Sequence, residues 1–200
     1  MKKSIAILGT ILTAGMLTAP VYAANPPSLY ISGDVGASWF NDFNASNGGT
    51  ISTTGGVNAL GALGVKWCDT YRLEAEFGYQ RNNLDKLNQS TGVVRNLSGF
   101  HSATSVLANG YYDFDAGSIK PYLTAGLGWA SVGINGSVET ETHSAFAYQV
   151  GAGLSIPLAK NVDIDARYRY FRTSTVTNEY WNDSFQIVSH SVLAGLRVGF

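Results

Sequence analysis

The most constraining feature of this 200-residue sequence is a repeated alternation of apolar and polar side chains. In residues 71–80, the clearest stretch, apolar side chains such as Leu73 alternate with charged ones such as Arg72. A period of two places the apolar residues on one face of an extended strand and the polar residues on the other. We therefore expect a chain of β-strands whose two faces differ.

Eight such stretches follow one another along the chain, with turn-forming residues between them. They are residues 29–40, 58–67, 71–80, 100–112, 121–130, 144–156, 162–170 and 185–200. The fourth stretch is the weakest, because Leu107 falls on the face that should be polar. The 23 glycines and the 20 tyrosines and phenylalanines (11 and 9) are typical of a β-rich chain with many turns.

The connectors between the stretches alternate in length. Three are short, at residues 68–70, 113–120 and 157–161, and four are long and polar, at residues 41–57, 81–99, 131–143 and 172–184. Tight turns at one end and long loops at the other are typical of bacterial outer-membrane barrels, whose termini both lie on the periplasmic side. We predict an all-β fold, an eight-stranded antiparallel up-and-down transmembrane β-barrel.

The charged residues indicate which face is the inside. A soluble ligand-binding cup has the same alternation with its apolar face inward, but in this sequence every charge within the eight stretches lies on the polar face. Lipid requires an uncharged outer face, because Arg or Lys at the bilayer midplane costs about 2–4 kcal/mol. An eight-stranded barrel is only wide enough for side chains to fill it, so we predict a buried network of five cations and five anions. Its members are Asp34, Lys66, Arg72, Glu74, Glu76, Asp163, Asp165, Arg167, Arg169 and Arg197.

Aromatic residues cluster near the strand ends, as an interfacial girdle requires. We expect Trp67, Tyr71, Tyr112 and Phe200 at the periplasmic interface. The outer interface would hold Trp39, Phe77, Tyr79, Trp129, Phe146, Tyr148, Tyr168 and Tyr170.

The N-terminus has the pattern of an export signal. Lys2 and Lys3 precede an apolar run over residues 5–17, and Val21-Tyr22-Ala23 has the small-x-small pattern that signal peptidase recognises. We predict a signal peptide over residues 1–23, cleaved after Ala23, and a barrel domain over residues 24–200. Cys68 is the only cysteine, which excludes an internal disulfide framework although an exported protein could form one.

Several classes of activity lack the residues that they need. With 13 Lys+Arg against 14 Asp+Glu, the chain has no basic excess for nucleic acid. His101, His143 and His190 show no metal-ligand spacing, so no metal and no cofactor are expected. Gly126-Leu127-Gly128 lacks the third glycine of a dinucleotide fingerprint and is interpreted as part of a strand.

A lipid-modifying enzyme and a narrow pore are the alternatives to a surface protein. His190-Ser191 and His101-Ser102 invite a Ser-His catalytic interpretation. Adjacent strand residues point to opposite faces, however, so neither serine can readily reach its neighbouring histidine. A filled lumen opposes the pore. We therefore expect no enzyme.

Three segments carry a family resemblance. Residues 191–200, which end in Phe200, resemble the signal by which outer-membrane proteins reach the barrel-assembly machinery, with Leu196, Val198 and Phe200 as its apolar positions. Residues 109–114 (NGYYDF) and 120–128 (KPYLTAGLG) resemble the small barrels of the opacity-protein and outer-membrane-protein-A-like superfamily. The resemblance implies a barrel in the cell outer membrane, surrounded by lipid and lipopolysaccharide, in a group that includes adhesins and surface antigens.

Function is therefore expected in the four long loops. We predict a structural, adhesin-like or antigenic surface protein, with Phe43, Tyr180 and Trp181 as contact residues for a host or surface ligand.

Overall fold

The computed structural model describes residues 27–41, 43–44, 50–88, 94–96, 100–135, 140–178 and 183–200. The predicted signal peptide lies outside the described residues, so its cleavage after Ala23 stays a prediction. Within the described ranges, no helix is long and apolar enough to cross a membrane.

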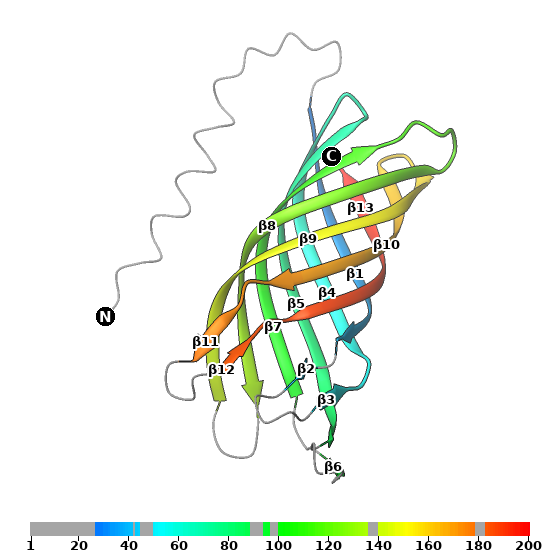
Figure 1. Cartoon of the computed structure of the whole chain (residues 1–200). Helices are drawn as coiled ribbons and strands as arrows, with labels where there is room; N and C mark the ends of the chain where they lie inside the picture. Colours follow the sequence, from blue (N-terminus) through cyan, green and yellow to red (C-terminus); the bar gives the residue numbers. More distant parts are fainter. Residues whose placement is uncertain are drawn as a thin grey trace, which may run out of the picture.

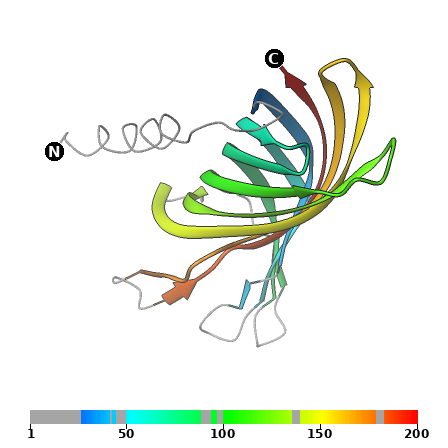
Figure 2. The same cartoon turned by 90° about the horizontal axis from the view of Figure 1, so that it is seen from above.

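Eight long strands form the body of the protein, and each pairs antiparallel with two neighbours. They are β1 (Ser28–Phe40), β4 (Gly56–Trp67), β5 (Tyr71–Asn88), β7 (Phe100–Asp113), β8 (Lys120–Asn135), β9 (Thr140–Ala159), β10 (Val162–Thr173) and β13 (Val188–Gly199). Strand β1 pairs with β4 on one side and β13 on the other, so the first and last strands close the sheet. The predicted eight-stranded barrel is confirmed, and its strands curve around one interior (Figure 2).

Five short strands extend the barrel at one end. These are β2 (Phe43–Asn44), β3 (Thr50–Thr53), β6 (Val94–Asn96), β11 (Val176–Asn178) and β12 (Asp183–Phe185). They lie at the end opposite the C-terminus (Figure 1), and β3 and β6 pair with the far end of β5. The prediction of four long loops is therefore partly wrong: β8 and β9 continue through most of residues 131–143, and β5 takes up residues 81–88.

The opposite end carries tight turns, as the connector lengths predicted. Cys68 and Asp69 have φ of 51° and 58° in the turn between β4 and β5, and Asn161 has φ of 65° in the turn between β9 and β10. The Cys68 thiol is exposed. These turns lie at the same end as the C-terminus (Figure 1), which places this end in the periplasm.

The two faces of each strand have the burial of an inside-out protein. On β5, Leu73 and Phe77 are 54% and 56% exposed, whereas Arg72 and Glu76 are 2% and 1% exposed. Soluble domains rarely bury Arg and Glu while they expose Leu and Phe. Lipid around the barrel explains both observations, because the apolar side chains then contact acyl chains and the charges are held inside.

Candidate functional site

The centre of the lumen is organised around the Glu76 carboxylate of β5. Arg167 and Arg169, both from β10, lie 3.2 and 3.3 Å from its oxygens. The Asn109 amide of β7 donates a 3.0 Å hydrogen bond to the same carboxylate, and Gln149 of β9 contacts it and the Arg169 guanidinium. Four strands therefore meet at one buried carboxylate.

Arg167 connects this centre to one further strand, β1, and makes a second contact with β7. Its Nη2 lies 3.2 Å from Asp34 of β1, and its Nη1 donates a 2.7 Å hydrogen bond to the Tyr111 hydroxyl of β7. Because Arg167 is only 4% exposed, losing any one of these partners would leave its charge poorly compensated.

A second cluster surrounds Arg72, nearer the periplasmic end. The guanidinium of Arg72 binds both oxygens of Asp113 at 2.7–3.1 Å. It stacks 4.2 Å from the Tyr111 ring centre, and Glu74 beside it accepts a 2.8 Å hydrogen bond from the Tyr30 hydroxyl. Sequence reasoning missed Asp113 by placing it in a turn, although it lies two residues beyond Tyr111 on the same inward face.

The periplasmic mouth holds the remaining predicted charges. Arg197 lies 2.9 Å from Asp163 and 3.5 Å from Asp165, and it donates a 2.7 Å hydrogen bond to Ser155. These contacts join β13 to β9 and β10.

Lys66 stands apart from the other predicted network residues. It pairs at 2.8 Å with Asp69 in the neighbouring turn, where the Asp69 side chain is 70% exposed. The hydrogen bond and the positive charge of Lys66 lower the pKa of the Asp69 carboxyl below its ordinary value. Asp113 adds a sixth carboxylate to the five predicted cations and five predicted anions, so the predicted equality of charges is wrong.

Glycines make room for these large inward side chains. A Cβ at Gly64 would lie 2.2 Å from the Tyr30 ring, and one at Gly126 would lie 1.8 Å from the Asn109 amide oxygen. These strand glycines therefore leave space for the inward side chains of the polar network.

Toward the extracellular end the lumen contains uncharged polar side chains and apolar side chains. Asn58 donates a 3.0 Å hydrogen bond to Ser191, and Ser38 donates a 2.8 Å hydrogen bond to Asn82. A buried cluster, which we call the apolar plug, closes this part of the barrel. It consists of Phe40, Ala103, Leu107, Ala130, Val132, Ala147, Phe171 and Ile187. In the sequence, the plug was indicated only by Leu107, an apolar residue on the face of its stretch that should be polar.

The outward face carries the aromatic residues expected at the two interfaces. Tyr71 and Tyr112 meet edge to face with ring centres 5.5 Å apart at the periplasmic end, and Trp129 and Phe146 meet edge to face at 6.2 Å further along the barrel. Arg81 on β5 and Arg172 on β10 also have outward positions, two residues beyond Tyr79 and Tyr170. The expectation of an outward face without strand charges is therefore wrong beyond the outer aromatic residues.

The geometry does not bring a Ser-His pair together at His190. His190 lies on the outer wall, where its Nδ1 is 2.6 Å from the Tyr168 hydroxyl, whereas Ser191 is buried in the lumen. The His101 side chain lies outside the described residues. In the described part of the chain, no group of three or more His, Cys, Asp or Glu residues could hold a metal ion.

Two sets of predicted contacts stay predictions. Tyr180 and Trp181 lie outside the described residues, and Phe43 belongs to β2, where only the backbone is described. Leu196, Val198 and Phe200 all point outward on the last strand or just after it, and the Phe200 amide donates a 3.0 Å hydrogen bond to the Leu29 carbonyl. Their recognition by the assembly machinery is still a proposal.

Comparison with known proteins agrees with this architecture. Residues 9–188 match a family model described as "Outer membrane protein beta-barrel domain". The chain is 27% identical over 189 residues to a 22 kDa outer membrane protein of Rhizobium leguminosarum bv. viciae, covering 91% of this chain and 82% of that protein. It also resembles the crystal structures of Neisserial surface protein A (TM-score 0.65, 24% identity, 88% of this chain and 100% of that chain) and of OprG from Pseudomonas aeruginosa (TM-score 0.62, 8% identity, 86% and 95%). This chain belongs to the outer membrane protein β-barrel domain family and resides in the outer membrane.

Proposed function

We propose that this barrel is a sealed surface protein that acts through its extracellular end as a structural, adhesin-like or antigenic component of the outer membrane. The observation that carries the proposal is the filled lumen. The apolar plug adjoins the Glu76 centre, since Leu107 is paired with Glu76 across β7 and β5, and Glu76, Val132 and Phe171 are each no more than 2% exposed. A solute would have to displace both.

The extracellular end supports the same proposal. Beyond Tyr79, strand β5 continues to Asn88 and pairs with β3 and β6, so the chain presents ordered backbone outside the membrane. Sites for partners are commonly carried by loops on a rigid scaffold. The contact residues proposed there are Phe43, Tyr180 and Trp181, with a host or surface ligand as the partner.

The proposed role also requires export of the chain, assembly of the barrel and contact with outer-membrane lipid. Residues 1–23 would direct export and would be removed after Ala23. Leu196, Val198 and Phe200 would present the last strand to the barrel-assembly machinery, and the outer wall would contact lipid and lipopolysaccharide. No catalytic role is assigned, because His190 and Ser191 lie on opposite sides of the wall.

Two measurements test the proposal. Refolded protein in a planar bilayer should give no steady current, since the plug and the charged centre block the lumen. Cells that display the protein should bind to a glycan array, and the double variant Tyr180→Ala/Trp181→Ala should lose that binding.

Phe114→Ala is the matched control for the binding experiment, because Phe114 is an exposed aromatic residue at the periplasmic end. This variant should bind as the wild type does. A steady pore current would favour the narrow pore, modified lipid A in producing cells would favour the enzyme, and unchanged binding by the double variant would reject the loop contacts.

A further inference from the structure

The lipid-facing wall contains a groove over β5, β7, β8 and β9. Two adjoining hollows of about 700 and 610 Å³ form it, and both are lined almost entirely by apolar groups. Both hollows are open along the outer wall and are not enclosed cavities. We call this surface the wall groove and define it by Leu73, Ala108, Gly110, Ala125, Leu127 and Val150.

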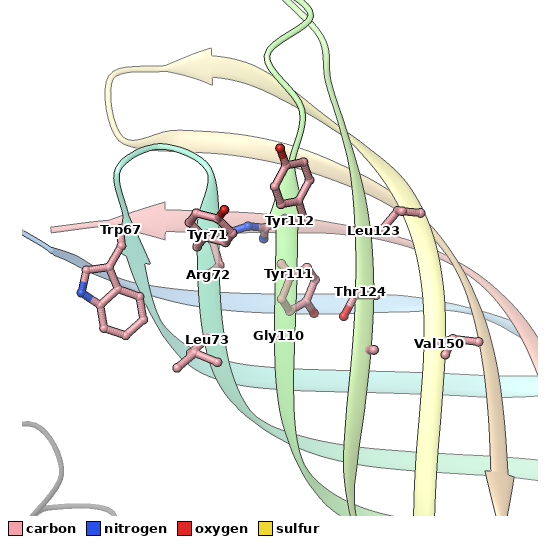
Figure 3. A pocket seen from close by; sticks show the side chains of 11 residues that line it. Trp67, Tyr71, Arg72, Leu73, Gly110, Tyr111, Tyr112, Leu123, Thr124 and Val150 are labelled. Carbon is pink, nitrogen blue, oxygen red and sulfur yellow. The ribbon is translucent and has the colours of Figure 1, made fainter.

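Strand register explains why the wall is hollow here. Leu73, Gly110, Ala125 and Val150 are paired in one row across the four strands. The two central positions have the smallest side chains, and a Cβ at Gly110 would have no neighbour nearer than 4.0 Å. The side chains of this row therefore project least in the middle and furthest at Leu73 and Val150. These two residues lie on either side of Gly110 in Figure 3.

Large side chains bound the wall groove toward each membrane surface. On the periplasmic side the next row contains Tyr71 and Tyr112, with Trp67 beside them (Figure 3). Toward the outer surface, Trp129 and Phe146 are paired across β8 and β9. The hollow therefore lies between the two aromatic girdles, where an occupant must be apolar.

The width of the wall groove selects a single chain. The backbones of β5 and β9 are three strand spacings apart, about 14 Å, and Leu73 and Val150 stand on both edges. The floor between them, made by β7 and β8, has only Gly110 and Ala125 in this row, so it is lower than both edges. The convex wall of a second barrel would rest on the edges, whereas a polymethylene chain can contact the floor and both sides.

We propose that the wall groove holds one acyl chain of a diacyl phospholipid from the periplasmic leaflet. Gly110 lies one row from Tyr112, so the hollow ends at the periplasmic girdle. Trp67, Tyr71 and Tyr112 have apolar rings and a polar N–H or O–H, which suits the boundary between acyl chain and headgroup. The site would thus retain one lipid more tightly than the rest of the wall, independently of any role of the loops.

Native mass spectrometry of the full-length mature barrel, extracted from outer membranes in mild detergent, tests the proposal. The wild-type spectrum should show a species with one bound phospholipid. Ala125→Leu raises the floor of the wall groove, and this variant should lose that species. Ala194→Leu is the matched control, because it adds the same bulk to an exposed alanine of β13 outside the wall groove, and it should keep the lipid.

Heat-dependent gel mobility verifies that both variants fold, and Gly110→Leu provides a second variant with the same expected loss. Retention of the phospholipid by folded Ala125→Leu, or its absence from the wild type, would overturn the proposal. A dimer that disappears in Ala125→Leu would assign the wall groove to a second copy, and bound lipopolysaccharide in place of phospholipid would reject the periplasmic leaflet. Both of these results also count against the proposal.

Discussion

Arg167 and Glu76 project from opposite walls of the barrel, β10 and β5, and their side chains meet at 3.2 Å across the lumen. The contact joins segments that are 91 residues apart in the sequence. The contact fills the interior of the barrel, whereas strand pairing closes its circumference.

Arg167→Ala should be strongly destabilising. The substitution leaves the Glu76 and Asp34 carboxylates without their shared guanidinium, and breaking a buried pair costs about 3–5 kcal/mol. The temperature at which the folded form loses its gel mobility should fall clearly. Lys66→Ala removes an ion pair whose Asp69 side chain is 70% exposed, so it should change stability by only about 0–1 kcal/mol. Equal effects of the two substitutions would contradict a buried network.

Two glycines of β4 should respond differently to alanine. Gly64→Ala places a methyl group within 2.2 Å of the Tyr30 ring, which the hydrogen bond to Glu74 holds in place, and such overpacking costs about 1–3 kcal/mol. Gly61→Ala, on the lipid-facing side of the same strand, meets nothing within 4 Å. Urea unfolding in lipid vesicles should separate the two variants, and a neutral Gly64→Ala would show that Tyr30 can move aside.

The apolar plug should contribute as a packed core does. Phe171→Ala creates a cavity among side chains that have no lipid or water to replace the ring, so we expect a loss of about 3–5 kcal/mol. Phe77→Ala on the outer wall removes the same atoms where acyl chains can fill the space, and it should cost less. Comparable unfolding free energies for both variants would mean that the plug is loosely packed.

The exposed pair at the periplasmic turn gives a prediction about pH. Because Lys66 lowers the pKa of Asp69 below its ordinary value of 3.8, the pair stabilises the folded state at neutral pH and loses this effect as the pH falls through the lowered pKa. Asp69→Asn should therefore be slightly less stable than the wild type at pH 7, and the difference should vanish in strong acid. A difference that grows on acidification would have the wrong sign for this ion pair.

The barrel could be predicted from the sequence because the membrane imposes a simple rule on each strand. Within the lipid, outward residues are apolar, so the inward positions of Arg72 and Glu74 follow from their alternation with Leu73 and Phe77. Outside the lipid the rule ends. Strand pairing continues along β5 past Arg81, where both faces can be polar, and the sequence pattern no longer distinguishes strand from loop.

The interior was less predictable than the wall. Lumen positions are free of the membrane rule and can be charged, polar or apolar, so Leu107 looked like an error in the pattern instead of a member of the apolar plug. Asp113 was missed for a related reason, because it lies at the end of β7 where a strand residue and a turn residue look alike. For both residues, counting in steps of two from the neighbouring inward residues would have predicted an inward side chain.

The connection between Arg167 and Glu76 also bears on how the molecule is made. Each half of the sheet, while separate, would carry uncompensated ions that a hydrocarbon environment strongly penalises. Only when the two halves are brought face to face do Arg167 and Arg169 reach the Glu76 carboxylate. A half-inserted intermediate is thus disfavoured at every stage, and insertion becomes a concerted event in which the last seam and the ionic centre form together.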